Sequence, residues 1–151
     1  ALGASKWMNL HYYNNQENNT LTAIKKLKKQ GYRVVATSPH ETSKTIQELD
    51  VISGKIALVF GNEVEGISDC VKENADEFVN IPMTGFTESF NVSVSAAICI
   101  HELVEKLKSE NIDFKLSSEE QNVILLDWMT KTIAKGEKVV PEVMKMIELT
   151  K

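Results

Sequence analysis

Several features that would assign this chain of 151 residues to a broad class are missing from it. No apolar run approaches the roughly 20 residues that cross a bilayer, and the N-terminus has no charged-then-apolar signal pattern. Membrane insertion and secretion therefore lack support, and we expect a cytoplasmic protein. Only two cysteines occur, Cys70 and Cys99, in neither CxxC nor Cys/His ligand spacing. We interpret both as structural thiols.

Three common ligand-binding motifs are also absent. The chain has no GxGxxG, no GK followed by Ser or Thr, and no metal-ligand triad, so dinucleotide, P-loop and metal sites are set aside. Seventeen basic against twenty-one acidic side chains give a net charge of −4, which argues against nucleic-acid binding by overall attraction. Any RNA contact must be local. Lys25, Lys26, Lys28 and Lys29 are the candidates, and a solvated helix face is the alternative interpretation.

The order of patterns along the chain predicts an α/β fold with a mostly parallel sheet and helices on both faces. A composition of 42% hydrophobic and 25% charged residues suffices for one core of normal density. Helical periodicity and strand-like apolar runs alternate, with caps and turn residues between them. The predicted elements are helices at 21–30, 68–74 and 91–109, strands at 32–37, 55–60 and 77–81, and a helical turn near Ile46 and Leu49.

The helix at 91–109 is apolar nearly all round at its start, so we expect its first half to be buried. That half is also rich in small side chains, which fits either a tightly packed core helix or one beside a ligand or a subunit interface. Further on, Ser117 and Glu120 have the spacing of a capping box that opens a helix. We predict that Gly136 ends this helix and that Pro141 is the first residue of the last one.

Two loops leave the strands at 55–60 and 77–81, where open α/β sheets bind ligands. We expect the turns leaving these neighbouring strands to form one cleft. The loops offer backbone amides, the carboxylate of Glu63, the hydroxyl of Ser89 and the carboxamide of Asn91. Taken alone, Glu63 is also explained as a surface or capping carboxylate. Ser89 or Asn91 alone is explained as the N-cap of the helix that follows.

Taken together, the two loops resemble a known pair of motifs. Residues 61–68 read GNEVEGIS and residues 81–97 read IPMTGFTESFNVSVSAA. In order and spacing these look like the second and third motifs of the SpoU-like (TrmH) RNA 2'-O-ribose methyltransferases of the SPOUT superfamily. Residues 1–7 resemble the family's Gly-Ala-x-Lys-Trp segment. Residues 116–133 resemble the helical extension of members that modify a D-loop guanosine in tRNA.

The resemblance implies a SPOUT methyltransferase domain at 1–110, with a deep trefoil knot, and a helical extension at 111–151 packed on it. It implies S-adenosyl-L-methionine as cofactor and RNA, tRNA before rRNA, as substrate. The implied reaction is methyl transfer to a ribose 2'-hydroxyl by a homodimer whose interface lies near residues 91–97. Backbone groups near Thr37, Gly61, Ile81 and Phe90 would hold the cofactor. Glu63, Ser89 and Asn91 would form the catalytic pocket.

One part of the family pattern has no counterpart in the sequence. The family assigns a central role to an arginine in a first motif, Asn-x-x-x-x-x-Arg, and the only arginine here is Arg33, whose surroundings differ. We expect Arg33 to be a surface or strand-edge residue and the first motif to lie upstream of Ala1. Two rivals stay open: a non-catalytic RNA-binding relative without the arginine, and an unknotted flavodoxin-like binding module.

Overall fold

The computed structural model of the protein describes residues 8–15, 17–39, 44–86, 89–133 and 135–148. Tyr13–Asp113 forms one compact unit, and the rest of the chain belongs to a second unit. The first unit contains the sheet and the predicted site. The second unit contains the two last helices and is described by itself.

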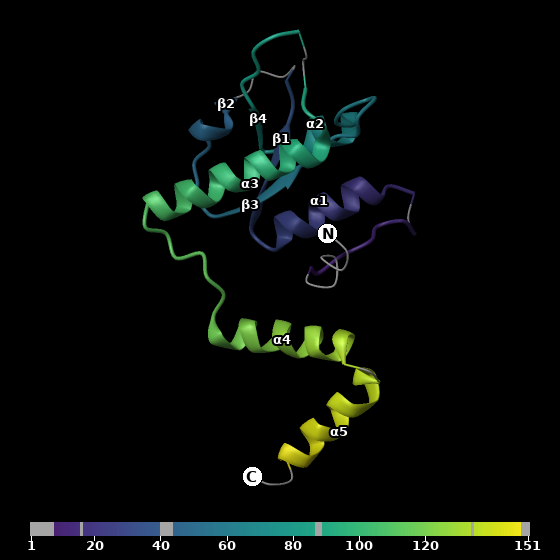
Figure 1. Ribbon diagram of the computed structural model, residues 1–151. Coiled ribbons are helices and arrows are strands. Elements are labelled where there is room, and N and C mark those ends of the chain that lie inside the picture. Colours follow the sequence, from purple (N-terminus) through teal and green to yellow (C-terminus); the bar gives the residue numbers. More distant parts are fainter. Residues whose placement is uncertain (1–7, 16, 40–43, 87–88, 134, 149–151) are drawn as a thin grey trace. The chain divides into compact units, whose positions relative to one another are not determined.

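The first unit is built on a four-stranded parallel sheet (Figure 1). Its strand order is β2-β4-β1-β3, and each pairing is parallel. These pairings confirm the predicted α/β class. The strands are β1 (Tyr32–Thr37), β2 (Lys44–Thr45), β3 (Lys55–Val59) and β4 (Glu77–Asn80). The two-residue strand β2 was not predicted, because two residues show no periodicity.

The strands that carry the two motif loops are not neighbours, so that expectation was wrong. Strand β1 lies between them: Val35 is paired with Leu58 of β3 on one side and with Glu77 of β4 on the other. The chain therefore reverses its direction across the sheet after β3. Such a reversal opens a crevice at the carboxyl ends of the strands, which is where open α/β sheets bind ligands.

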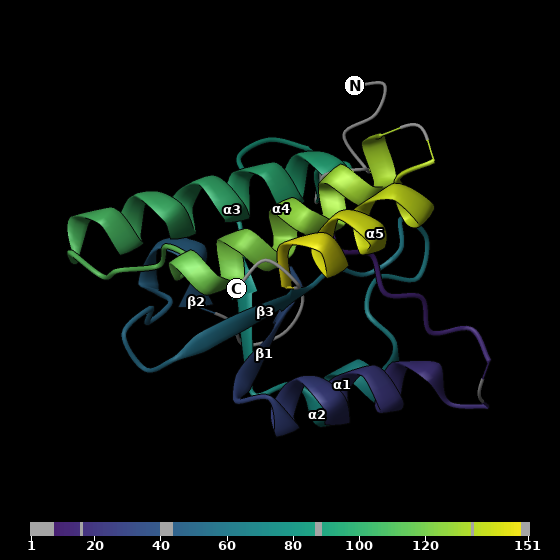
Figure 2. The same cartoon turned by 90° about the horizontal axis from the view of Figure 1, so that it is seen from below.

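Helices cover both faces of this sheet, as predicted (Figure 2). Helices α1 (Asn19–Lys29) and α2 (Asp69–Asn74) pack on one face. Helix α3 (Val92–Ser109) and the 3₁₀-helix η2 (Ile46–Glu48) pack on the other. The apolar stripe of each helix meets one face of the sheet, so the unit has two cores.

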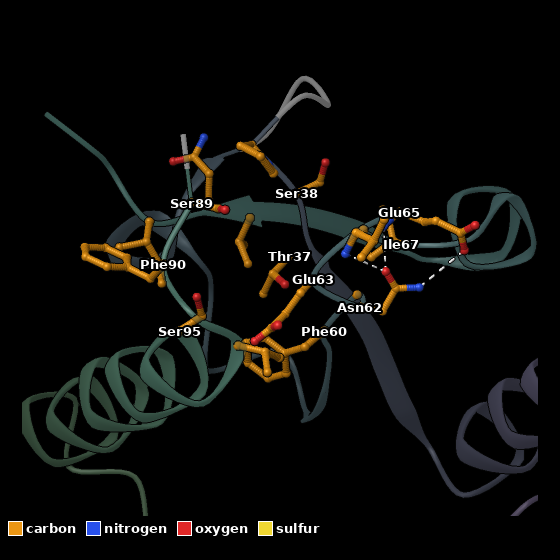
Figure 3. Close-up of a pocket in the computed structure, with 18 of the residues that line it drawn as sticks. Thr37, Ser38, Phe60, Asn62, Glu63, Glu65, Ile67, Ser89, Phe90 and Ser95 are labelled. Atoms are coloured by element: carbon orange, nitrogen blue, oxygen red, sulfur yellow. Dashed lines mark hydrogen bonds between the residues drawn. The ribbon is translucent and has the colours of Figure 1, made fainter. Parts of the chain in front are cut away.

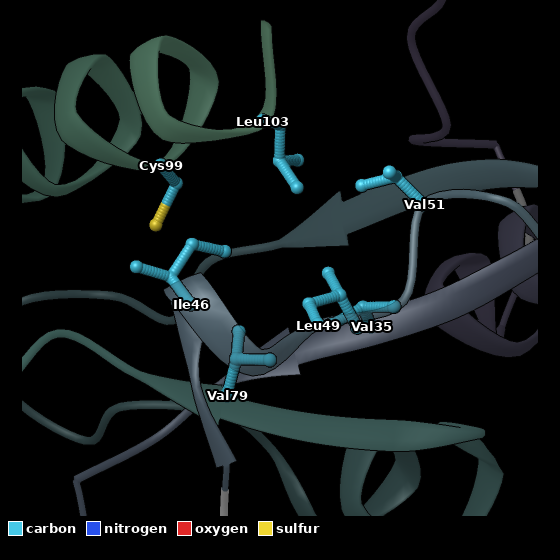
Figure 4. Close-up of a cluster of buried hydrophobic side chains, with 7 residues drawn as sticks. All are labelled: Val35, Ile46, Leu49, Val51, Val79, Cys99 and Leu103. Carbon is cyan, nitrogen blue, oxygen red and sulfur yellow. The ribbon is translucent and has the colours of Figure 1, made fainter. Parts of the chain in front are cut away.

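The larger core joins α3 to the sheet (Figure 4). Cys99 and Leu103 of α3 lie over Val35 and Val79 of the central strands, with three further buried side chains from the segment between β2 and β3. Burying one such side chain stabilises a fold by about 1.5–3 kcal/mol. Burial also raises the pKa of the Cys99 thiol, and the nearby charge of Glu102 adds to this. Cys99 is thus a neutral core residue, as interpreted from the sequence.

The first half of α3 is exposed, which corrects the expectation that it would be buried. Val92 and Val94 have exposed fractions of 37% and 45%, whereas the fully buried positions of the helix are Cys99 and Leu103. The reason is that the first turns of α3 border a pocket instead of a core, since Val92 and Ser95 line that pocket.

The cap considered at Asn91 is confirmed, and Ser68, predicted as the first residue of its helix, is also an N-cap. Asn91 and Ser68 are the N-caps of α3 and α2, and each accepts a backbone N–H from the first turn of its helix. For α1 the sequence pattern predicts Asn19 or Thr20 as the N-cap, but the N-cap is Asn18. Its Oδ1 accepts the N–H of Leu21 at 3.3 Å, and Asn is among the best N-cap residues.

The second unit contains α4 (Ser118–Thr132) and α5 (Gly136–Glu148). The predicted capping box is confirmed: Glu120 N–H donates to Ser117 Oγ at 3.2 Å, and Ser117 N–H donates to Glu120 at 2.9 Å. The next two predictions were wrong, because Gly136 begins α5 and Pro141 lies inside it. Helix α4 ends at Thr132, because its C-cap Ile133 has extended backbone angles (φ −77°, ψ 133°), and Lys135, with φ of 61°, lies directly before α5. No helix in the described ranges is long and apolar enough to span a membrane.

Candidate functional site

A pocket of about 380 Å³ opens at the carboxyl ends of β1, β3 and β4 (Figure 3). This volume is within the range of small-molecule sites. Its lining combines apolar side chains with hydroxyl, amide and carboxylate groups. The residues used below are Thr37, Ser38, Phe60, Gly61, Asn62, Glu63, Ile67, Lys72, Ile81, Met83, Ser89, Phe90 and Ser95.

The first wall is the loop after β3, which folds back on itself. Asn62 N–H donates to the Gly66 carbonyl at 3.0 Å, and Gly66 N–H donates to the Asn62 carbonyl at 3.2 Å. Gly66 has φ of +69°, which favours glycine. A Cβ on Gly61 would lie 2.1 Å from the Gly66 carbonyl carbon, so only glycine fits there. This wall is therefore formed largely by backbone.

The second wall is the segment that joins β4 to α3. It ends at Asn91, whose Oδ1 accepts the N–H of Ser93 at 2.9 Å and so caps α3. The Nδ2 of the same side chain donates to Oε1 of Glu63 at 2.8 Å. One carboxamide thus joins the two walls. The amide of Asn91 thus serves both as the N-cap of α3 and as a partner of Glu63.

The floor of the pocket is the end of the central strand β1. Thr37 Oγ1 donates to the Val59 carbonyl of β3 at 3.2 Å. Ser38 N–H donates to the Val79 carbonyl of β4 at 3.0 Å, and Ser38 is buried. Since these two residues hold the ends of β3 and β4 to β1, they fix the separation of the two walls.

The structure brings the seven predicted site residues together. Six of them line this single pocket: Thr37, Gly61, Glu63, Ile81, Ser89 and Phe90. The seventh, Asn91, contacts it through its bond to Glu63. Their individual roles stay predictions. The family-like segment at 1–7 and Glu88 of the third motif lie outside the described residues.

Sequence reasoning missed several residues of the lining. Ser38 directly follows one predicted strand and Phe60 is the last residue of another, so their position at the carboxyl edge was available as a signal. Ser95 was noted only as a small residue of α3. Lys72 had no usable signal, because a lysine on a short helix is normally solvated. It is the basic side chain among the described lining residues, and it also pairs with Asp69 at 3.6 Å.

Arg33 lies at the start of β1, at the opposite end of this strand from Thr37. Its guanidinium forms an ion pair with Glu77 and donates to the Asp50 carbonyl. It is half-buried and does not line the pocket. Arg33 therefore has a structural function at the start of the central strand β1, where it is half-buried; we expected a surface or strand-edge residue.

Comparison with known proteins identifies the family to which both motif loops belong. Residues 1–101 match the SpoU rRNA Methylase family. This chain belongs to that family. Both motif loops and all the lining residues named above fall within the matched residues.

Individual SpoU relatives match most of the chain. The tRNA (guanosine(18)-2'-O)-methyltransferase of Borreliella burgdorferi is 39% identical over 133 residues, which are 88% of this chain and 59% of that protein. A 23S rRNA (guanosine-2'-O-)-methyltransferase of Coxiella burnetii is 42% identical over 77 residues, 51% of this chain and 30% of that protein. The chain thus spans about six tenths of the first relative's length.

A solved structure agrees with the fold. The TrmH/SpoU tRNA modifying enzyme of A. aeolicus superposes with a TM-score of 0.72 at 29% identity, and the match covers 87% of this chain and 66% of that one. The similarity extends well beyond residue 101. It therefore includes part of the C-terminal helices.

Proposed function

We propose that the protein containing this chain transfers a methyl group from S-adenosyl-L-methionine to a ribose 2'-hydroxyl of RNA, with tRNA the first candidate. The observation that carries the proposal is the meeting of both SpoU motif loops in one pocket, joined by the bond between Asn91 and Glu63. The tRNA assignment is supported by the length of the match. The relative named for guanosine 18 of tRNA matches 88% of the chain, which includes residues beyond the family match at 1–101.

The pocket suits S-adenosylmethionine in size and in chemistry. A nucleoside has flat apolar faces and polar edges, and the lining offers both kinds of surface, with Phe60, Ile67 and Ile81 beside Thr37 and Ser38. We assign cofactor binding to the backbone near Thr37, Gly61, Ile81 and Phe90. The glycine requirement at Gly61 supports this, because it lets the backbones of Gly61 and Gly66 pack directly against each other in the pocket wall. The chemistry that the cofactor supplies when bound is an activated methyl group.

The remaining residues would arrange the RNA. A ribose hydroxyl is a poor nucleophile at neutral pH and must lose its proton as the new bond forms. We assign its orientation to Ser89 and Asn91, with the Glu63 carboxylate holding the Asn91 amide at 2.8 Å. Glu63 is exposed, so its second oxygen is accessible to RNA. Correct placement of reacting groups contributes a large part of most enzymatic rate enhancements.

Activation of the hydroxyl is not assigned to Arg33. The guanidinium is engaged by Glu77 and by the Asp50 carbonyl at the far end of β1. If no other arginine of the protein enters the pocket, the second candidate function applies: an RNA-binding relative that holds the cofactor without catalysis. An Asn and an Arg at the family spacing in an upstream segment would support the enzyme instead.

The architecture that accompanies this function is also a proposal. We assign residues 1–110 to a knotted SPOUT domain and residues 111–151 to a helical extension, in a homodimer. The exposed Val92 and Val94 on the first turns of α3 support an interface there, because apolar side chains next to small ones allow close packing of a second chain. A cytoplasmic location, where tRNA is matured, would accompany the activity.

Labelled S-adenosylmethionine with separate tRNA and rRNA pools tests the function in the full-length protein. We expect label in tRNA, mapped to a ribose. If only rRNA is labelled, the activity is instead ribose methylation of 23S rRNA, for which the Coxiella burnetii relative is named. Calorimetry with S-adenosylhomocysteine separates the other candidates. Binding without methyl transfer indicates the non-catalytic relative, and no binding contradicts the cofactor assignment.

A further inference from the structure

The loop 62–66 on the pocket wall keeps its shape with little help from packing. All five residues are exposed, and Val64, its apolar side chain, has an exposed fraction of 93%. Exposed loops without buried apolar contacts open easily. This one nevertheless has to hold its backbone against Gly61 and deliver Glu63 to Asn91. Hydrogen bonds must therefore supply the order.

The loop's hydrogen bonds converge on Asn62 (Figure 3). Its Oδ1 accepts two backbone N–H groups, from Val64 at 2.9 Å and from Glu65 at 2.6 Å. Its Nδ2 donates to the Glu65 carboxylate at 3.4 Å. Its own backbone forms the reciprocal pair with Gly66. Asn62 therefore contacts every loop residue beyond Glu63.

We infer that Asn62 is a positioning residue, which holds this loop in the form that binds the methyl donor. This inference rests on the proposed function. A ligand that meets a disordered loop must order it on binding, which lowers affinity, whereas a preformed loop removes that loss. Because the loop is exposed, its order contributes little to the free energy of unfolding. Loss of the Asn62 side chain should thus weaken ligand binding more than it weakens the fold.

The side chain of Asn62 can be replaced in a way that separates its two functions. Asn62→Asp keeps an oxygen in place for the Val64 and Glu65 amides, but removes the donor to the Glu65 carboxylate and adds a negative charge there. Asn62→Ala removes both the acceptor and the donor. Asn74→Ala is the matched control, since Asn74 donates to the Cys70 carbonyl at 2.9 Å within α2 and does not line the pocket.

The experiment measures S-adenosylhomocysteine affinity by calorimetry, urea unfolding, and amide hydrogen exchange for the wild-type chain and these three variants. We expect Asn62→Ala to bind about tenfold more weakly than wild type, and Asn62→Asp to recover to within roughly threefold. The Val64 and Glu65 amides should exchange faster in Asn62→Ala only. Both Asn→Ala variants should unfold at similar urea concentrations.

Three outcomes would overturn the inference: wild-type affinity in Asn62→Ala, equal weakening in the Asp and Ala variants, or unchanged exchange at Val64 and Glu65. Failure of the proposed function appears differently. A wild-type chain that binds no S-adenosylhomocysteine contradicts the cofactor assignment and the effect on affinity. In that case the exchange rates still decide whether Asn62 holds the loop.

Discussion

The two ends of the sheet both carry clusters of polar side chains, but they use their carboxylates differently. At the amino end, Glu77 pairs with Arg33 and Lys44, and Asp76 pairs with Lys28. At the carboxyl end, Glu63 and Glu65 accept from the amides of Asn91 and Asn62. Neither of these two carboxylates forms an ion pair among the described residues.

This difference separates a stabilising end from a binding end. Ion pairs at the amino end neutralise charge and fix the starts of β1 and β4. At the carboxyl end, neutral amides hold the carboxylates in place without cancelling their charge, so the charge stays available to a ligand. Carboxylates without an ion-pair partner are more common at functional sites than elsewhere in a fold. Substitutions at the carboxyl end should therefore affect binding first, and those at the amino end should affect stability first.

The largest effect is expected for Gly61→Ala. The added Cβ would lie 2.1 Å from the Gly66 backbone, so the wall must move. We expect S-adenosylhomocysteine affinity to fall by about 100-fold and stability by about 1–3 kcal/mol. Gly54→Ala is the control: Gly54 has φ of +113° but open space around it. That variant should lose about 1–2 kcal/mol of stability and keep its affinity. If Gly61→Ala and Gly54→Ala lost the same affinity, the division of the sheet into a stabilising end and a binding end would be wrong.

The next effect is expected for Asn91→Ala in the full-length protein. The variant loses both the cap on Ser93 and the bond to Glu63. We expect methyl transfer to fall by roughly 100-fold, with only about 1 kcal/mol lost from the free energy of unfolding. Asn18→Ala removes the matching cap of α1 and should lose similar stability with activity retained. If activity falls in proportion to stability in both Asn91→Ala and Asn18→Ala, Asn91 acts only as a capping residue.

A smaller effect, on stability alone, is expected for Asp76→Ala at the amino end. Its carboxylate accepts the N–H of buried Val34 at 2.7 Å and the ammonium of Lys28 at 2.6 Å. Leaving that N–H unpaired should cost about 1–2 kcal/mol in urea unfolding. Asp76→Asn, which keeps an oxygen acceptor, should cost less. S-adenosylhomocysteine affinity should stay unchanged in both, and a loss there would contradict the comparison.

The Asp76 effect should depend on pH. Desolvation raises the pKa of this carboxyl, but the hydrogen bonds from Lys28 and Val34 outweigh it and lower the pKa below its ordinary value. A lowered pKa contributes stability that is complete above the unfolded-state value and is lost as pH falls through the folded-state value. The stability difference between wild type and Asp76→Ala should thus be full above about pH 4 and shrink below it. A difference that grows on acidification would contradict this cause.

The smallest effect is expected for Lys44→Met. Its ammonium lies 3.2 Å from Glu77, but the side chain is 58% exposed, and Arg33 already pairs with the same carboxylate. Exposed ion pairs contribute little because water screens them. We expect a change within about 0.5 kcal/mol in urea unfolding. A loss above 1 kcal/mol would mean that the amino end depends on the whole network.

The sequence predicted most of this architecture where a local cause exists. Caps at Ser68, Asn91 and Ser117 mark helix starts, because side-chain oxygens there satisfy the first backbone amides. The predicted site residues are also brought together, since the strands that carry them end at one edge. Their position was thus predictable, although their roles are not yet tested.

Features that depend on distant parts of the chain were not predictable. The position of β1 between β3 and β4 leaves no mark in either strand, because a buried parallel strand looks the same at any place in a sheet. The exposure of Val92 and Val94 was missed because apolar periodicity does not distinguish a core from a pocket rim. The start of α5 was misplaced because Lys135, with positive φ, gives no compositional warning.

The strand order has a consequence for how the pocket forms during folding. Because the chain crosses β1 on its way from β3 to β4, the bonds that hold the pocket together join residues far apart in the chain: Ser38 N–H donates to the Val79 carbonyl, and Asn91 donates to Glu63, 28 positions away. Contacts of such long range form late, since the chain must first give up the freedom of a large loop. No partly folded chain that lacks β4 can hold the ligand. Binding of a ligand to this pocket therefore reports that the sheet is completely folded.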